Sequence, residues 1–207
     1  RTGEASAYPF DDLLLPQQWH LVNRGNMFGE KSIVDADVQC EQAWELSTGD
    51  ESIVVAVLDE GVMIEHPDLK NNMWVNENEI YRSHEDNDGN GYQGDVYGYN
   101  FVKNTGVISW DDVNDTGHGT HVAGIIAASV NNGEGVAGVA PNAKIMALRV
   151  ANESGGFLTS AVLGAYSYMK KAAQARVNLV AANNSWMGAG ESPLLTEVMD
   201  DLYRSNG

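Results

Sequence analysis

The chain has 207 residues, of which 43% are apolar and 20% are charged, and this composition is typical of a globular domain or of most of a larger one. It excludes a disordered chain, a collagen and a coiled coil. The 29 acidic residues outnumber the 12 basic ones and give a net charge of −17, which repels a phosphate backbone, so nucleic acid is not an expected partner.

Cysteine content and hydropathy bear on the compartment of the protein. Cys40 is the one cysteine of the sequence, so cysteine usage neither requires nor excludes an oxidising compartment, and we expect its thiol in the core. The longest apolar run covers residues 53–58, far below the roughly 20 residues of a membrane helix, and no membrane span is predicted. The sequence opens on Arg1 without a leader, which we interpret as a trimmed chain.

The first half of the chain predicts a strand between two irregular regions. Residues 1–50 lack periodicity apart from an amphipathic helix at residues 38–46, with Asp37 as N-cap, and we interpret them as an N-terminal wrap or linker. Residues 53–58 read IVVAVL, apolar on both faces as in a buried parallel strand. The Gly-, Asn- and Asp-rich chain that follows predicts a long loop region with one short strand at residues 99–102.

The second half alternates helix and strand. Helices are predicted over residues 119–129, 159–176 and 193–205, the last with Ser192 as N-cap and Pro193 in its first turn, and strands over residues 144–150 and 177–182. We therefore expect an α/β domain over residues 51–207, built on a doubly wound parallel sheet with flanking helices. Sites in such sheets lie beyond the carboxyl ends of the strands, where Asp59 and Ser185 are expected.

A histidine between two glycines is the first candidate catalytic residue. Residues 115–124 read DTGHGTHVAG, which places His118 at the start of a helix, where glycines allow close backbone approach and the imidazole is exposed. Asp59, at the end of a buried strand, is the natural partner because a carboxylate there fixes the imidazole tautomer. Singly, such an Asp often caps a helix and such a His is often a core or surface residue. The combination favours catalysis.

Three blocks of the sequence resemble the subtilisin-like serine proteases. VAVLDEG at residues 55–61, with HPDL at residues 66–69, resembles the block of the family's catalytic Asp. HGTHVAGIIAA at residues 118–128, followed by GVAGVAP at residues 135–141, resembles the block of its catalytic His. NNSW at residues 183–186 resembles the strand end that lines its substrate cleft. The resemblance covers nearly the whole chain and implies a subtilisin-like fold.

The resemblance implies a serine endopeptidase that hydrolyses peptide bonds through an Asp-His-Ser triad. Asp59 would orient the histidine, His118 would act as general base and then acid, and a serine would attack the scissile carbonyl. The family's Gly-Thr-Ser-Met-Ala block and the Ala-Ala-Gly-Asn block with its oxyanion-hole Asn do not occur in the sequence. We therefore expect a chain in which the C-terminal part of the catalytic domain is absent and which is inactive alone. The alternative is an inactive subtilase-like scaffold, a calcium-stabilised binding or assembly module.

The resemblance also implies partners and a location. The partners are a polypeptide substrate and the missing C-terminal part of the domain, with a propeptide left open, and the location is extracellular or in the cell envelope. Two edges that clamp an extended peptide in the family have counterparts here. They are Ser185 with Trp186, and the extended run of Ser154, Gly155 and Gly156.

Several positions depart from the family pattern. Met187 replaces a Gly after Ser-Trp and is expected to crowd the strand on which a substrate pairs, and Glu60 replaces a small residue after the catalytic Asp. Thr159 and Ser160 faintly echo the nucleophile block, but at a helix start after two glycines they are expected to be ordinary caps.

A zinc site is the rival reading of the histidines. His118 and His121 are three residues apart on a predicted helix, a spacing seen among zinc ligands. The two residues between them supply no carboxylate for a hydrolytic zinc site, and we expect His121 to be buried beside the helix. We therefore predict no zinc.

Calcium is the expected cofactor, because residues 86–95 read DNDGNGYQGD and place oxygen ligands at alternate positions around a turn glycine, as an EF-hand loop begins. The predicted ligands are Asp86, Asp88, Asn90, Tyr92 and Asp95. Asp95 would have to close the shell because Tyr97 stands where an EF-hand has its last Glu, and a series of turns without an ion is the alternative. The subtilase resemblance also implies calcium at this loop, and at a second site formed by Asp68, Val130, Asn132, Glu134 and Val136.

Overall fold

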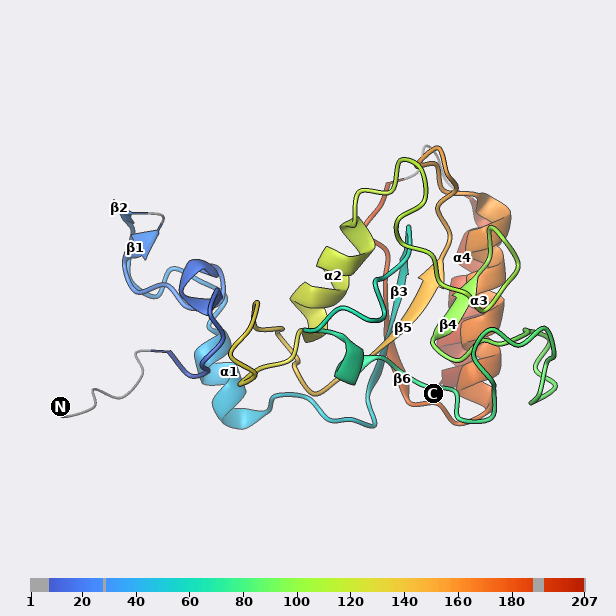
Figure 1. Ribbon diagram of the computed structural model, residues 1–207, viewed down its shortest axis with the longest axis horizontal. Coiled ribbons are helices and arrows are strands. Elements are labelled where there is room, and N and C mark those ends of the chain that lie inside the picture. Colours follow the sequence, from blue (N-terminus) through green and yellow to red (C-terminus); the bar gives the residue numbers. More distant parts are fainter. Residues whose placement is uncertain (1–7, 28, 188–191, 207) are drawn as a thin grey trace.

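A parallel sheet forms the centre of the computed structural model, which describes residues 8–27, 29–187 and 192–206 (Figure 1). Its strands are β3 (Val54–Asp59), β4 (Gly98–Asn100), β5 (Lys144–Arg149) and β6 (Leu179–Asn183). They are all parallel and lie in the order β4-β5-β3-β6, so β3 is flanked by β5 on one side and by β6 on the other. This arrangement confirms the predicted doubly wound α/β fold.

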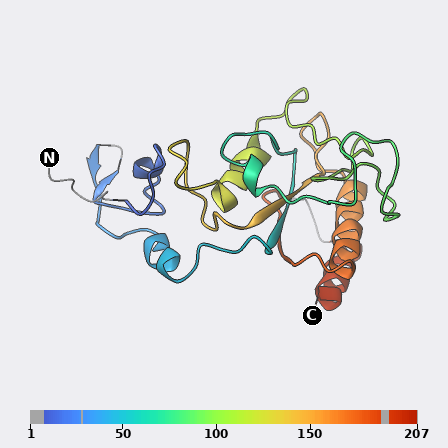
Figure 2. The same ribbon diagram turned by 60° about the horizontal axis from the view of Figure 1, so that its bottom comes forward.

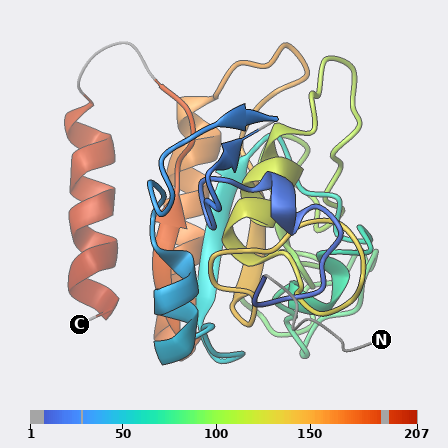
Figure 3. The same ribbon diagram turned by 90° about the vertical axis from the view of Figure 1, so that its left-hand side faces the viewer.

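Helices cover both faces of the sheet (Figures 1 and 3). On one face α2 (His118–Ala127) packs on β3 and β5. On the other face lies α3 (Thr159–Gln174), and α4 (Pro193–Asn206) packs beside α3. Across the described residues, no helix is both long and apolar enough to cross a bilayer.

Successive side chains of the central strands enter two separate cores. On β3, Ala56 and Leu58 pack with residues of α3, whereas Val57 packs with residues of α2. The same alternation on β5 sets Met146 and Leu148 against Ile145 and Ala147. Because neighbouring residues of a strand face opposite sides, a strand covered by helices on both faces has to be apolar throughout, as the IVVAVL run predicted.

The predicted helices and strands all occur, with ends shifted by a few residues. The helix expected at residues 38–46 is α1 (Cys40–Leu46), and Ser192 Oγ accepts a hydrogen bond from Leu195 N at 3.3 Å, which confirms its capping role. Two predicted caps are wrong. Asp37 does not cap α1, because its carboxylate instead binds the backbone N–H groups of Asn23 and Gln39, both at 2.7 Å.

The second wrong cap concerns the start of α3. Thr159 is the first residue of the helix and Ser160 the second, so both lie inside it. The N-cap is Leu158, which has an extended backbone and makes no side-chain capping hydrogen bond.

The N-terminal segment lies to one side of the sheet and docks on the loop that follows α2 (Figure 2). It contains η1 (Leu15–Gln17), the hairpin of β1 (Asn26–Met27) and β2 (Glu30–Lys31), and α1. A further short helix, η2 (Lys70–Asn72), lies outside this segment and follows β3. The side chain of Gln18 exchanges two hydrogen bonds with the backbone of Ala137, at 2.9 and 2.7 Å, and Trp44 Nε1 donates to Val139 O at 2.9 Å. Cys40 is buried in this small core, as expected, and burial raises the pKa of its thiol. The boundary at residue 50 stays a prediction.

The start of α2 approaches the end of β3 so closely that it requires glycine. A Cβ atom on Gly119 would lie 2.1 Å from the carbonyl oxygen of Gly61 and 3.0 Å from Asp59 Cβ. Gly61 itself has a φ of +117°, in the region that side chains disfavour. The two glycines therefore bring His118 within reach of Asp59.

This contact predicts opposite effects for two Gly-to-Ala substitutions in one helix. Gly119→Ala should lower the free energy of unfolding by about 1–3 kcal/mol, because its methyl group overlaps the carbonyl oxygen of Gly61, two residues after β3. Gly124→Ala should raise that free energy by up to about 1 kcal/mol, because a Cβ there meets no atom within 4 Å and alanine favours the helix. Urea unfolding of both variants checks this, and equal effects would contradict the close approach.

Candidate active site

Asp59 and His118 meet at the carboxyl end of the sheet. Asp59 ends β3 and is 1% exposed, and His118 begins α2. His118 Nδ1 lies 2.9 Å from both carboxylate oxygens of Asp59, while 46% of the His118 side chain is exposed. Because the carboxylate accepts a hydrogen bond from Nδ1–H, Nε2 is left unprotonated in the neutral ring. The pair can therefore accept a proton from an incoming group.

A buried ion pair holds the loop that leads to His118. Arg149, the last residue of β5, is 0% exposed, and its guanidinium binds both carboxylate oxygens of Asp115 at 2.6 and 3.0 Å. Arg149 Nη1 also donates to Ser109 O at 3.1 Å. Sequence reasoning missed this pair. The available signal was an Arg at the end of an otherwise apolar strand, because a buried guanidinium needs a carboxylate partner.

A second ion pair on the same loop lies nearer the surface. Lys103 Nζ lies 2.6 Å from Asp112 Oδ2, and this hydrogen bond lowers the pKa of the Asp112 carboxyl and raises that of Lys103. Asp112 also accepts a hydrogen bond from Ser109 Oγ at 2.7 Å. Both ion pairs thus fix the loop before α2.

Trp186 follows β6 by three residues and contacts the backbone next to Asp59. Its Nε1 donates to Leu58 O at 3.0 Å, and its ring stacks on Phe157 with centroids 5.0 Å apart and planes at 23°. Ser185 Oγ accepts a hydrogen bond from Asn183 Nδ2 at 2.9 Å. The side chain of Met187 is 97% exposed, and the crowding of a paired substrate by this side chain stays a prediction.

The run at residues 154–156 is a turn and not the extended edge that we expected. The side chain of Asn152 closes it, because Asn152 Oδ1 accepts from Ser154 N at 3.0 Å and from Gly156 N at 2.9 Å. Gly155 has a φ of +73°, and Gly156 O accepts from Asn152 N at 2.8 Å. The backbone groups of Gly156 are therefore bound within the turn.

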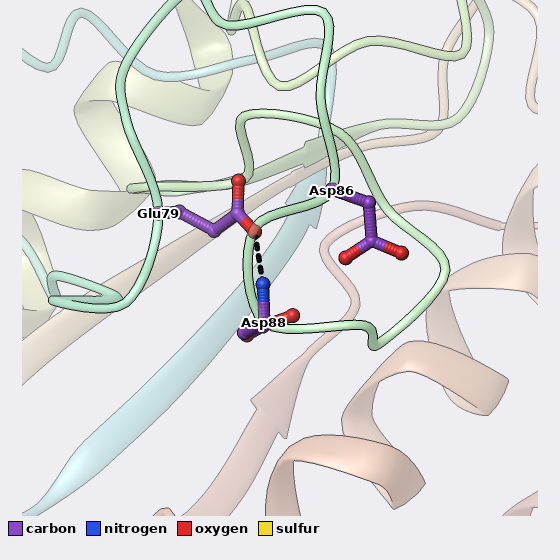
Figure 4. Close-up of side chains that lie close together, drawn as sticks. All are labelled: Glu79, Asp86 and Asp88. Carbon is purple, nitrogen blue, oxygen red and sulfur yellow. Dashed lines mark hydrogen bonds between the residues drawn. The ribbon is translucent and has the colours of Figure 1, made fainter.

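An acidic cluster on the loop after β3 is able to hold a metal ion (Figure 4). Glu79, Asp86 and Asp88 each offer a carboxylate oxygen, and these oxygens all lie within 4.8 Å of one another. Glu79 also accepts from the backbone N–H groups of Asn87 at 2.6 Å and Asp88 at 3.0 Å, which folds the loop around its side chain. Sequence reasoning missed Glu79, because it precedes the Asp- and Gly-rich run that supplied the spacing.

The other predicted ligands of this loop lie beside the cluster. Asp95 is 0% exposed, and its Oδ2 accepts from Tyr168 OH at 2.6 Å and from Asn90 Nδ2 at 3.0 Å. Its Oδ1 has no hydrogen-bond donor, and burial raises the pKa of this carboxyl. Asn90 Nδ2 also bonds to Asp88 Oδ2 at 3.1 Å, while the ring of Tyr92 packs on Tyr168. A buried carboxylate oxygen without a donor fits a hard cation, but Asp95 does not belong to the group of three side chains whose oxygens lie within 4.8 Å of one another.

The predicted second metal site is a loop folded around Asp68. Asp68 Oδ1 accepts from Asn132 Nδ2 at 2.7 Å, and Oδ2 accepts from Val136 N at 2.9 Å. Glu134 is exposed, and its N–H donates to Asn132 Oδ1 at 3.0 Å. Asp12 was missed by sequence reasoning. It is buried against this loop with its Oδ1 lacking a donor, and burial raises the pKa of its carboxyl.

The zinc alternative finds no support in the geometry of the histidines. His121 is exposed, so the expectation that it is buried was wrong. The buried face of α2 carries Gly119, Ala123 and Ala127, four residues apart. Among the residues that the structure describes, neither His118 nor His121 belongs to a group of three ligating side chains within 4.8 Å of one another.

Comparison with known proteins decides the family. Residues 50–202 match the peptidase S8 subtilase family. The chain belongs to this family. The subtilase resemblance inferred from the three sequence blocks is thereby confirmed.

The relatives of this subtilase include proteases of protozoa and bacteria. It is 47% identical over 97 residues to subtilisin-like protease 1 of Plasmodium berghei, which covers 46% of this chain and 16% of that protein. It is 33% identical over 141 residues to thermitase of Thermoactinomyces vulgaris, which covers 68% of this chain and 41% of that protein. Its structure is similar to a protease from Pseudoalteromonas arctica, with a TM-score of 0.66, 29% identity, and coverage of 96% of this chain and 57% of that one. The matches span less than half of either sequence relative.

The Arg149–Asp115 pair predicts a strong coupling between two substitutions. Arg149→Met should lower the free energy of unfolding by about 3–5 kcal/mol, because it leaves the carboxylate of Asp115 buried without its partner. Adding Asp115→Asn should recover part of that loss, because the buried charge is then gone. Urea unfolding of the single and double variants measures the coupling, and additive effects would mean that the pair does not act as one unit.

Proposed function

We propose that this chain is part of the catalytic domain of a serine endopeptidase that hydrolyses peptide bonds. Asp59 and His118 would be two members of an Asp-His-Ser triad, and the serine would lie outside these 207 residues. The observation that carries the proposal is the contact of His118 Nδ1 with both carboxylate oxygens of Asp59 at 2.9 Å, while the imidazole ring of His118 stays partly exposed. Membership of the subtilase family supports it.

The two residues of the pair have different roles in the proposed reaction. The carboxylate of Asp59 holds the imidazole with Nε2 facing outward and stabilises the imidazolium once it forms. His118 Nε2 takes the proton of the serine hydroxyl as the serine oxygen bonds to the peptide carbonyl carbon. It then gives this proton to the leaving amine.

The substrate in this proposal is a polypeptide that lies along the end of β6. Ser185 and Trp186 would line its path, supported by the bond of Trp186 Nε1 to Leu58 O, one residue before Asp59. The turn at residues 154–156 would contact substrate from the other side through Ser154 and Gly155, because the backbone groups of Gly156 are already bound.

The triad proposal is tested on the complete protein. Intact mass and C-terminal sequencing define that protein, and a fluorophosphonate probe should label a serine beyond Gly207. Asp59→Asn should lower kcat/KM for a peptide substrate by about 10⁴-fold, because the wrong imidazole tautomer is then held. The matched control is Asp111→Asn, an exposed carboxylate of the loop before α2, which should leave kcat/KM unchanged.

Two outcomes would overturn the proposal in different ways. An unchanged rate in Asp59→Asn would contradict the role of this carboxylate. A complete protein that neither takes up the probe nor cleaves peptides would favour the alternative, a calcium-stabilised binding or assembly module without catalysis.

We also propose that calcium stabilises this part of the protein, and that the protein is exported to the cell envelope or the medium. One ion would be held by Glu79, Asp86 and Asp88, with Asn90, Tyr92 and Asp95 completing its shell. Three clustered carboxylates and the donor-free Oδ1 of Asp95 support this site. A second ion would lie at Asp68, with Val130, Asn132, Glu134 and Val136, and the donor-free Oδ1 of Asp12, whose Oδ2 binds Asn131 N of the same loop, would be a further ligand.

Calcium removal should lower the melting temperature, because an ion that binds only the folded state stabilises it by mass action, by about 2.7 kcal/mol at a hundred times its Kd. Asp88→Asn should reduce this shift to the part that the second ion at Asp68 contributes. The control is Glu85→Gln, an exposed acid of the same loop, which should retain it. Thermal melts with calcium and with excess chelator test the site, and an equal calcium shift in Asp88→Asn would exclude the proposed cluster.

A further inference from the structure

Glu60 follows the candidate catalytic Asp59 directly and is not used in the mechanism above. It is 8% exposed, and it forms no ion pair among the described residues. Its Oε1 accepts three hydrogen bonds, from Thr116 N at 2.8 Å, Thr116 Oγ1 at 3.0 Å and His118 N at 2.7 Å. A buried carboxylate with this many donors has a defined position.

These three donors lie at the start of α2, where the helix has no cap of its own. The N-cap is Gly117, which has a φ of 76° and no side chain with which to bind the first N–H groups. The negative charge of Glu60 is also favourable there, because a helix N-terminus carries a partial positive charge. Glu60, the residue after β3, therefore supplies the cap that α2 lacks.

Two consecutive acids thus hold the same histidine. Asp59 binds the ring of His118 through Nδ1, and Glu60 binds the backbone N–H of His118. Asp59 Oδ1 in addition accepts from Glu60 N at 2.8 Å, which ties the orientation of the first carboxylate to the backbone of the second residue. The position of the ring relative to Asp59 depends on both contacts.

We propose that Glu60 is a positioning residue for His118. Its carboxylate anchors the first turn of α2, so that the imidazole already lies on Asp59 before substrate binds. The effect on turnover rests on the proposed protease function, whereas the effect on the position of the imidazole does not.

The test compares three substitutions in the complete protein. Glu60→Met keeps the length of the side chain and removes the acceptor. Glu60→Gln keeps an acceptor oxygen without the charge. Glu65→Met, at an exposed position a few residues further along, is the matched control. The readouts are the proton resonance of His118 Nδ1–H in protein with labelled histidine, and kcat and KM measured separately.

We expect Glu60→Met to broaden or remove the His118 Nδ1–H resonance and to lower kcat by roughly 10- to 100-fold with KM within twofold, because a displaced base slows the reaction without weakening substrate binding. Glu60→Gln should keep the resonance and lose less than about tenfold in kcat, and Glu65→Met should match the wild type. If Glu60→Met does not fold, Glu60→Asp replaces it. Its side chain is one methylene shorter and cannot reach Thr116 and His118 together, so it should show the same loss.

A Glu60→Met or Glu60→Asp protein that keeps both the resonance and kcat would overturn the inference, even if its melting temperature falls. A wild-type protein without peptidase activity would refute the proposed function alone. The resonance would then still decide the role of Glu60.

Discussion

The close packing of the first turn of α2 on the carboxyl end of β3 is the constraint on which the candidate site depends. Gly61 and Gly119 allow the two backbones to approach, and Thr120 Oγ1 accepts from Met63 N at 2.9 Å as a further link. Because a strand and a helix are both rigid, the separation of Asp59 from His118 is fixed by backbone packing and not by loop conformation.

The neighbouring strand β5 supports the same arrangement through its last residue. Arg149 is the register partner of Asp59 across β5 and β3, so the ends of the two strands lie side by side. One strand end orients the histidine, and the other binds Asp115 in the loop that precedes it. Parallel pairing in this register therefore brings together the contact of Asp59 with His118 and the contact of Arg149 with Asp115. It also explains why a buried Arg ends an apolar strand.

Periodicity and local motifs were enough to predict the sheet, its helices and the pairing of Asp59 with His118. The apolar runs and turn glycines that carry these signals consist of residues that are close together in the sequence. Contacts made by a distant side chain were not predictable. Glu79 and Asp12 reach their loops from outside the motifs, and Asn152 closes the turn that we expected to be extended. The exposure of His121 was missed for another reason, since the buried stripe of α2 consists of small residues with little hydrophobic signal.

The docking of the N-terminal segment has a consequence for how the chain folds. Gln18 and Ala137 are 119 residues apart, and Trp44 and Val139 are 95 apart. During synthesis, the apolar side chains of this segment can pack on one another, but their cluster lacks Val130 and Ala137 until the chain beyond α2 has emerged from the ribosome. Such non-local contacts carry a loop-closure entropy, so we expect the segment to dock after the sheet and α2 have assembled.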